Sequence, residues 1–228
     1  MTARHLIEVK DLTFGYRGRP PLFDGAALAI HENDQIGLWA DNGTGKTTLL
    51  RILTGLVRPQ SMTLTLDGRV ISDEEGFRAV RRHFGFVLQN PDDQLFFPEV
   101  LDDVMFGPLN LGLSYEEARE RSEAALGELG IAELAHAESF RLSGGQKRLV
   151  SLACVLSMAP DGLLLDEPTA GLDRGARERL IRVLQGLRGP RLCVSHSMAF
   201  LQAVSSRLVT IRDGHIAALD FDGAGHFG

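Results

Sequence analysis

The stretch LWADNGTGKTTLL, residues 38–50, decides the fold. A strand-like run, QIGLWA, leads into it, and TTLLRILTGL follows with helical periodicity. Glycines between a strand and a helix let backbone N–H groups wrap an anion at the start of the helix. The stretch therefore predicts a phosphate-binding loop of the pattern G-x-x-x-x-G-K-[ST], with alanine, Ala40, in place of its first glycine.

Ala40 and Asp41 depart from the usual loop chemistry. Alanine at 40 removes no N–H donor, and it costs roughly 1 kcal/mol or more only if that residue needs a positive φ. A solvated Asp41 carboxylate would contribute little after screening. We predict that the loop binds MgATP, with Lys46 on the β/γ-phosphates and Thr47 on Mg²⁺. The expected ATP-binding residues here are Asn42, Gly43, Thr44, Gly45, Lys46, Thr47 and Thr48.

The composition is that of an ordinary globular domain. The chain has 228 residues, 44% of them hydrophobic and 24% charged, which suits one domain with a proper core. A net charge of −6 with scattered basic residues argues against a nucleic-acid partner. No apolar run is long enough for a membrane span, so a membrane role requires a partner. Cys154 and Cys193 lie in apolar runs and are expected to be buried core residues.

The pattern along the chain predicts an α/β core interrupted by a helical insertion. We expect a single domain over 1–228, with a core in 1–89 and 160–228 and a helical subdomain in 90–159. Residues 27–40 are expected to form a hairpin that turns at ENDQ. Further strands are expected in 6–16, 62–71, 84–89, 162–167, 191–196 and 207–219, and helices in 46–55, 114–130, 144–159 and 174–187.

GLLLDEP, residues 162–168, is a buried strand that ends in two carboxylates. Asp166 is placed to hold Mg²⁺ through water, and Glu167 to polarise an attacking water. A solvated acidic turn is the alternative, and the phosphate-binding loop upstream makes it the weaker one.

LSGGQKR, residues 142–148, places Ser143 where it can cap a helix, while two glycines leave the first amides open to an anion. An ordinary capped helix would need only one glycine. The motif resembles the signature of ATP-binding cassette (ABC) ATPases. That resemblance, which covers nearly the whole chain, implies a P-loop NTPase (RecA-like) core, an N-terminal antiparallel β subdomain and an inserted helical signature subdomain.

The resemblance also implies roles for single residues. Tyr16 matches the aromatic residue that stacks on adenine, and His196 matches the histidine that contacts the γ-phosphate. Gln89 matches the glutamine that joins the core to the helical region and senses Mg²⁺ and water. Asp173, in TAGLD, matches the loop that crosses between subunits. Taken alone, Tyr16 and His196 would more often be structural residues.

Two such cassettes pair head to tail in this family, so that each signature closes over the ATP held by the other chain. The residues expected to act in trans are Ser143, Gly144, Gly145 and Gln146. Because the chain carries both halves, a homodimer is sufficient, while a heterodimer with a related ATPase stays open.

Residues 89–114, QNPDDQLFFPEVLDDVMFGPLNLGLS, resemble the same region of the ATPases of energy-coupling factor (ECF) importers, including cobalt, nickel and biotin systems. The resemblance implies a peripheral subunit at the cytoplasmic face of the membrane, joined to a membrane coupling component and a substrate-binding component. Asp92, Asp93, Phe96 and Phe97 suit a surface that receives an arginine and an apolar knob. The alternative is a solvated acidic turn above internally packed phenylalanines.

Two departures from the family pattern leave the cargo open. Ser197 follows His196 where an acidic residue is common, and the chain ends soon after RDGHI. Asp220, Asp222 and His226 match no defined metal-site spacing.

The alternatives to an ECF importer are another ABC transporter class, a soluble ABC ATPase, and a regulatory subunit that binds ATP without turning it over.

Overall fold

The computed structural model describes residues 5–219, which fall into two compact units. The first unit comprises residues up to 81 and from 189 onward, and the second comprises residues 82–188. Each unit combines strands and helices, as an α/β fold requires. The expected division into a core and a helical subdomain over 90–159 stays a prediction.

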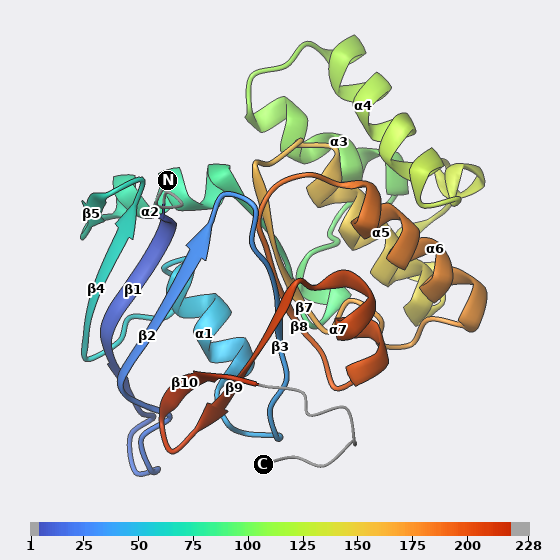
Figure 1. Cartoon of the computed structure of the whole chain (residues 1–228). Coiled ribbons are helices and arrows are strands. Elements are labelled where there is room, and N and C mark those ends of the chain that lie inside the picture. The colour runs from blue at the N-terminus through green and yellow to red at the C-terminus, as the bar shows by residue number, and fades with distance from the viewer. Residues whose placement is uncertain (1–4, 220–228) are drawn as a thin grey trace. The chain divides into compact units, whose positions relative to one another are not determined.

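The first unit contains an antiparallel sheet with the strand order β2-β1-β4-β5. In Figure 1 its strands run from blue to teal. The turn between β4 and β5 lies at Asp67 and Gly68, which have φ angles of 51° and 75° and form the expected hairpin. The bounds are β1 His5–Phe14, β2 Phe23–His31, β4 Ser61–Leu66 and β5 Arg69–Ile71.

A second sheet in this unit is built on β3 (Gln35–Leu38), and it shows that the hairpin expected over 27–40 is wrong. β2 pairs with β1, whereas β3 lies parallel to β8 (Arg191–Val194) and β9 (Arg207–Arg212). The physical reason is burial: the side chains of Ile36 and Leu38 are fully buried, as in a central parallel strand. The turn before β3 therefore connects two sheets.

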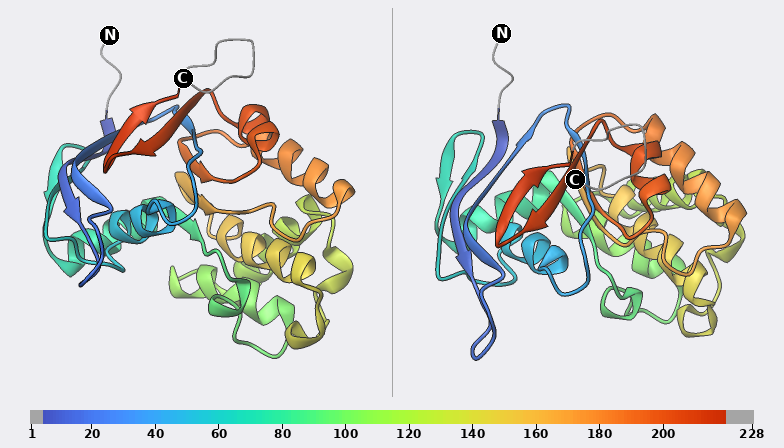
Figure 2. Two further views of the ribbon diagram at one scale, coloured as in Figure 1. Left: turned by 90° about the horizontal axis from the view of Figure 1, so that it is seen from below. Right: turned by 60° about the horizontal axis from the view of Figure 1, so that its bottom comes forward.

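Helix α1 (Lys46–Leu53) follows β3 and buries Leu49, Leu50 and Ile52 completely. The unit also contains α7 (Met198–Val204) and most of α2 (Glu74–His83), whose last two residues belong to the second unit. The strand β10 (His215–Ala218) pairs antiparallel with β9. Figure 2 shows this red hairpin beside β2, where the Asp24 amide donates to the Gly214 carbonyl at 3.1 Å.

The second unit holds a parallel pair of strands, β6 (Phe84–Val87) and β7 (Gly162–Asp166), and most of the helices. The helices α3, α4 and α5 pack against one another (Figure 1) and bury Val104, Leu126 and Val150 completely. The helix bounds are α3 Val100–Asn110, α4 Tyr115–Glu128, α5 Gly144–Leu156, α6 Arg174–Gly186, η1 Pro91–Asp93, η2 Ala132–Leu134 and η3 Ser139–Arg141.

Helix α3 was not predicted, because its sequence contains Gly107 and Pro108, which usually end helices. Proline cannot donate to the carbonyl four residues earlier, which here belongs to Val104. The Ser157 hydroxyl donates to that carbonyl instead, at 3.0 Å. A side chain on Gly107 would come 2.6 Å from Met158, so glycine permits the close packing. Tertiary contacts therefore replace what the local sequence lacks.

Cys154 and Cys193 are buried free thiols, as predicted. Burial raises the pKa of both, that of Cys193 to about 12. Between residues 5 and 219, no helix is long and apolar enough to cross a bilayer. The same residues contain no cluster of three or more His, Cys, Asp or Glu that could hold a metal ion. Asp220, Asp222 and His226 lie outside the described residues.

Candidate nucleotide site

The side chain of Lys46 hydrogen-bonds to the first residues of the phosphate-binding loop. Lys46 Nζ donates to the carbonyl oxygens of Ala40 and Asp41, at 2.7 Å each. Gly43 and Gly45 have φ angles of 80° and 106°, a region that glycine reaches at no steric cost. Because α1 begins directly after Gly45, the loop turns its backbone around the N-terminus of a helix. This geometry suits a phosphate group.

Ala40 carries no backbone strain. Five non-glycine residues in the described chain have positive φ, namely Asp11, Asp67, Ala159, Glu167 and Asp213. Ala40 is not one of them, and its side chain is 3% exposed. Glycine is therefore not needed at this position, and the steric cost considered for alanine does not arise. Asp41 is exposed, so its carboxylate is open to solvent.

Tyr16 lies beside the helix that follows the loop. Its hydroxyl is 3.3 Å from Thr48 Oγ1, and its ring meets the Phe14 ring edge-on. The side chain of Gln60 accepts from the Gly15 amide and donates to the Gly15 carbonyl, which fixes the chain just before Tyr16. Tyr16 is 44% exposed, so the ring is accessible to an adenine base.

His196 lies just beyond the carboxyl end of β8, at the same edge of the sheet as the phosphate-binding loop. Leu38, the last residue of β3, pairs in parallel with Val194, the last residue of β8. The carboxyl ends of parallel strands are where α/β sheets bind ligands. Ser197 accepts from the Phe200 amide at 3.4 Å and caps α7, which gives this serine a structural role next to His196.

In the second unit Gln89 and Glu167 also follow the carboxyl ends of parallel strands, so they lie at the same edge of the β6–β7 pair. Val87 of β6 pairs in parallel with Leu165 of β7, and each predicted residue follows two positions later. Asp166 is 1% exposed at the end of β7. Carboxylate oxygens such as those of Asp166 are hard ligands of the kind that Mg²⁺ prefers.

Arg148 is a residue for which the sequence suggested no role. It is 7% exposed in α5, and its Nη1 donates to the Leu88 carbonyl, just before Gln89, at 3.0 Å. Burial lowers the pKa of this guanidinium, while the carboxylates of Asp166 and Glu167 act to raise it. Arg148 belongs to the LSGGQKR run, but its proximity to the two carboxylates is a property of the fold.

The signature residues begin α5 with a complete capping box. Ser143 Oγ accepts from the Gln146 amide, and Gln146 Oε1 accepts from the Ser143 amide. A Cβ on Gly145 would lie 2.8 Å from the Gly171 carbonyl oxygen, so the signature packs directly on the TAGLD loop. In that loop Asp173 caps α6 by accepting from the Ala176 amide at 2.8 Å.

The residues predicted to meet a membrane partner form a partly apolar surface. Phe96 is 62% exposed, and its ring lies 5.4 Å from that of Phe97 and 5.3 Å from that of Phe106. Asp92 forms an ion pair with Lys147 at 2.6 Å, and Asp93 Oδ1 accepts from the side chain of Asn90. A groove of about 350 Å³ is lined by Asp92, Leu95, Phe96, Phe97, Pro98, Ser139, Phe140 and Lys147.

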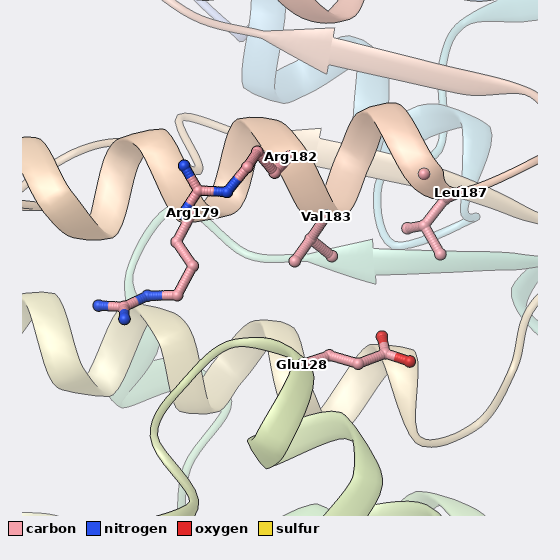
Figure 3. Close-up of a pocket in the computed structure, with 6 residues that line it drawn as sticks. Glu128, Arg179, Arg182, Val183 and Leu187 are labelled. Atoms are coloured by element: carbon pink, nitrogen blue, oxygen red, sulfur yellow. The ribbon is translucent and has the colours of Figure 1, made fainter.

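A second cavity, of about 370 Å³, lies in the same unit but contains no predicted site residue. Figure 3 shows Glu128 of α4 opposite Val183 of α6 and Leu187, which follows the end of that helix. The guanidinium of Arg179 and the carboxylate of Glu128 point in different directions there, so they do not converge on a ligand.

The sequence-predicted residues therefore form two sets, one in each unit. The phosphate-binding loop, Tyr16 and His196 belong to the first, and the carboxylates, Gln89 and the signature belong to the second. Their roles at a shared nucleotide site stay predictions.

Comparison with known proteins identifies the family. The ABC transporter family matches residues 23–170. The cobalt import ATP-binding protein CbiO of Rhodobacter capsulatus is 41% identical over 217 residues, which cover 93% of this chain and 78% of the relative. The energy-coupling factor transporter ATP-binding protein EcfA of Methanosphaera stadtmanae is 38% identical over 215 residues, covering 92% and 77%.

The fold is confirmed by a solved structure. CbiO1 from Clostridium perfringens, described as part of the ABC transporter complex cbiONQ, superimposes with a TM-score of 0.80 at 30% identity. The superposition covers 94% of this chain and 87% of that one. The chain belongs to the ABC transporter family and is one of its ATP-binding subunits, an ABC ATPase.

Proposed function

We propose that this chain is the ATPase subunit of an ECF-type importer. The observation that carries the proposal is the combination of its likeness to CbiO and EcfA with the exposed aromatic and acidic surface at Asp92–Phe97. The cargo is a transition metal ion, cobalt or nickel, or a vitamin such as biotin. The chain acts at the cytoplasmic face of the membrane as a peripheral subunit.

In this proposal two copies, or one copy and a related ATPase, sandwich ATP between the loop of one chain and Ser143–Gln146 of the other. Lys46 binds the β/γ-phosphates, Tyr16 stacks on adenine and His196 contacts the γ-phosphate. Glu167 accepts the proton of a water whose oxygen attacks the γ-phosphorus as the bond to the β-phosphate oxygen breaks. Mg²⁺, held through Thr47, Gln89 and Asp166, would neutralise charge on the phosphates when bound.

Nucleotide-driven movement passes to a membrane coupling component through the groove beside Phe96. The carboxylate of Asp92 is already paired with Lys147, so a partner arginine would share or displace that contact. The exposed ring of Phe96 offers the apolar part of the surface. Substrate recognition belongs to a separate membrane component.

The proposal is tested by purifying the tagged chain from its native membranes in mild detergent and identifying the bound proteins by mass spectrometry. We expect a small coupling protein and a substrate-binding membrane protein with the wild-type chain, and neither with Phe96→Asp, because a charge in an apolar contact resists desolvation.

The control for this experiment is Val70→Asp, which places the same charge at a residue 67% exposed on β5. It should recover the membrane proteins as the wild type does. Recovery of soluble partners alone with the wild-type chain would contradict the importer and favour a soluble ABC ATPase.

A further inference from the structure

Asp103, in the first turn of α3, is a buried carboxylate, 4% exposed. A buried charge is costly unless it is paired or hydrogen-bonded. In the part of the chain that the structure describes, no lysine, arginine or histidine forms an ion pair with it. Its charge is therefore stabilised by hydrogen bonds, and these connect two separate segments.

One oxygen of Asp103 holds the loop that carries the exposed phenylalanine. Oδ1 accepts from the backbone amides of Phe96 and Phe97, at 2.8 and 3.0 Å. The other oxygen, Oδ2, accepts from the Ser139 hydroxyl at 2.9 Å. A single rigid side chain thus joins the proposed partner-binding loop to the segment that begins at Ser139.

That segment leads directly to the signature, which the proposed function places against ATP. Ser139 begins η3, and four positions later Ser143 caps α5. The backbone reinforces the link, because the Ser139 amide donates to the Pro98 carbonyl at 2.8 Å and the Val100 amide to the Ala137 carbonyl at 3.1 Å. A continuous chain of hydrogen bonds therefore runs from the Phe96 loop through Asp103 and Ser139 to the segment that ends at Ser143.

We infer that Asp103 is a positioning residue that couples the Phe96–Phe97 loop to the signature through Ser139. The inference rests on the proposed function, since it gives this linkage a partner on one side and ATP on the other. Asp103 itself touches neither. A purely structural carboxylate would stabilise the fold equally with and without nucleotide, whereas a coupling carboxylate makes the loop respond to nucleotide.

The test uses the purified full-length chain without any membrane protein. Residue-resolved hydrogen exchange of the Phe96 and Phe97 amides is measured with and without ATPγS and Mg²⁺, for wild type and Ser139→Ala. We expect nucleotide to slow exchange of the Phe96 and Phe97 amides in the wild type. Ser139→Ala should reduce this slowing about tenfold, which is the size expected for loss of one hydrogen bond to a charged group.

Ser122→Ala is the matched control, because Ser122 is another fully buried serine whose hydroxyl bonds only within its own helix, to Ala118. Asp103→Asn and the double variant with Ser139→Ala complete the cycle, in which the two changes should be non-additive. Should Asp103→Asn fail to fold, the comparison of Ser139→Ala with Ser122→Ala still tests the inference.

The inference is overturned if Ser139→Ala responds to nucleotide as Ser122→Ala does, or if nucleotide leaves the wild-type loop amides unchanged. Because no membrane protein enters this experiment, its outcome is separate from that of the purification. Failure to recover membrane proteins would contradict the importer proposal but would not affect the measured coupling between the Phe96 loop and the signature.

Discussion

The Glu167→Gln variant is expected to hydrolyse ATP about 10² to 10⁴ times more slowly than the wild type while still binding it, because a positioned general base contributes a factor of this size. Glutamine keeps the shape of the side chain but cannot take the proton from the attacking water. Glu167 follows the buried strand β7 and has a φ of 50°, an uncommon conformation for a non-glycine residue.

Steady-state phosphate release measures the rate, and equilibrium binding of a fluorescent ATP analogue measures affinity. Glu178→Gln is the matched control, since Glu178 is an exposed residue of α6 paired with Arg174 at 2.8 Å. It should hydrolyse ATP at the wild-type rate. A Glu167→Gln variant with undiminished kcat would show that another group accepts the proton.

The Gly145→Ala variant is expected to lose about 1 to 3 kcal/mol of unfolding free energy, the usual cost of overpacking. The added methyl group would lie 2.8 Å from the Gly171 carbonyl oxygen, and backbone on both sides leaves little room to adjust. Since the displaced residues belong to the signature and the TAGLD loop, ATP hydrolysis should fall about tenfold or more, as for a comparable loss of transition-state positioning.

Gly144→Ala provides a control for this prediction, because a Cβ at that position meets no atom within 4 Å in this chain. Its unfolding free energy in urea should equal or exceed that of the wild type, since alanine favours helix. Equal stability of the two alanine variants would mean that the packing of Gly145 on Gly171 does not constrain the signature.

The elements that carry motifs could be predicted from the sequence, because glycines, caps and apolar runs specify them locally. The phosphate-binding loop, the helix beginning after Ser143 and the strand ending at Asp166 lie where they were expected. Helix α2 was missed because charged residues dominate its sequence and only Phe77 and Val80 are buried on it. The false hairpin arose because a turn signal does not say which sheet each flanking strand joins.

The polar residues that support the candidate site could not be predicted. Arg148 lies within a recognised motif, yet its link to the Leu88 carbonyl joins residues 60 positions apart. In the sequence Asp103 is one of several acidic residues. Only the fold shows that its carboxylate accepts hydrogen bonds from Phe96, Phe97 and Ser139. Such partners are set by tertiary packing, which a local pattern does not encode.

The most direct test of the central claim is ATP-driven uptake by the purified complex in proteoliposomes. Labelled cobalt, nickel and biotin are supplied in turn on the side opposite the ATPase, with MgATP on the ATPase side. We predict that one of these accumulates with the wild-type chain and that none does with Glu167→Gln. Equal uptake by both complexes would contradict the claim that this chain's ATP hydrolysis powers import.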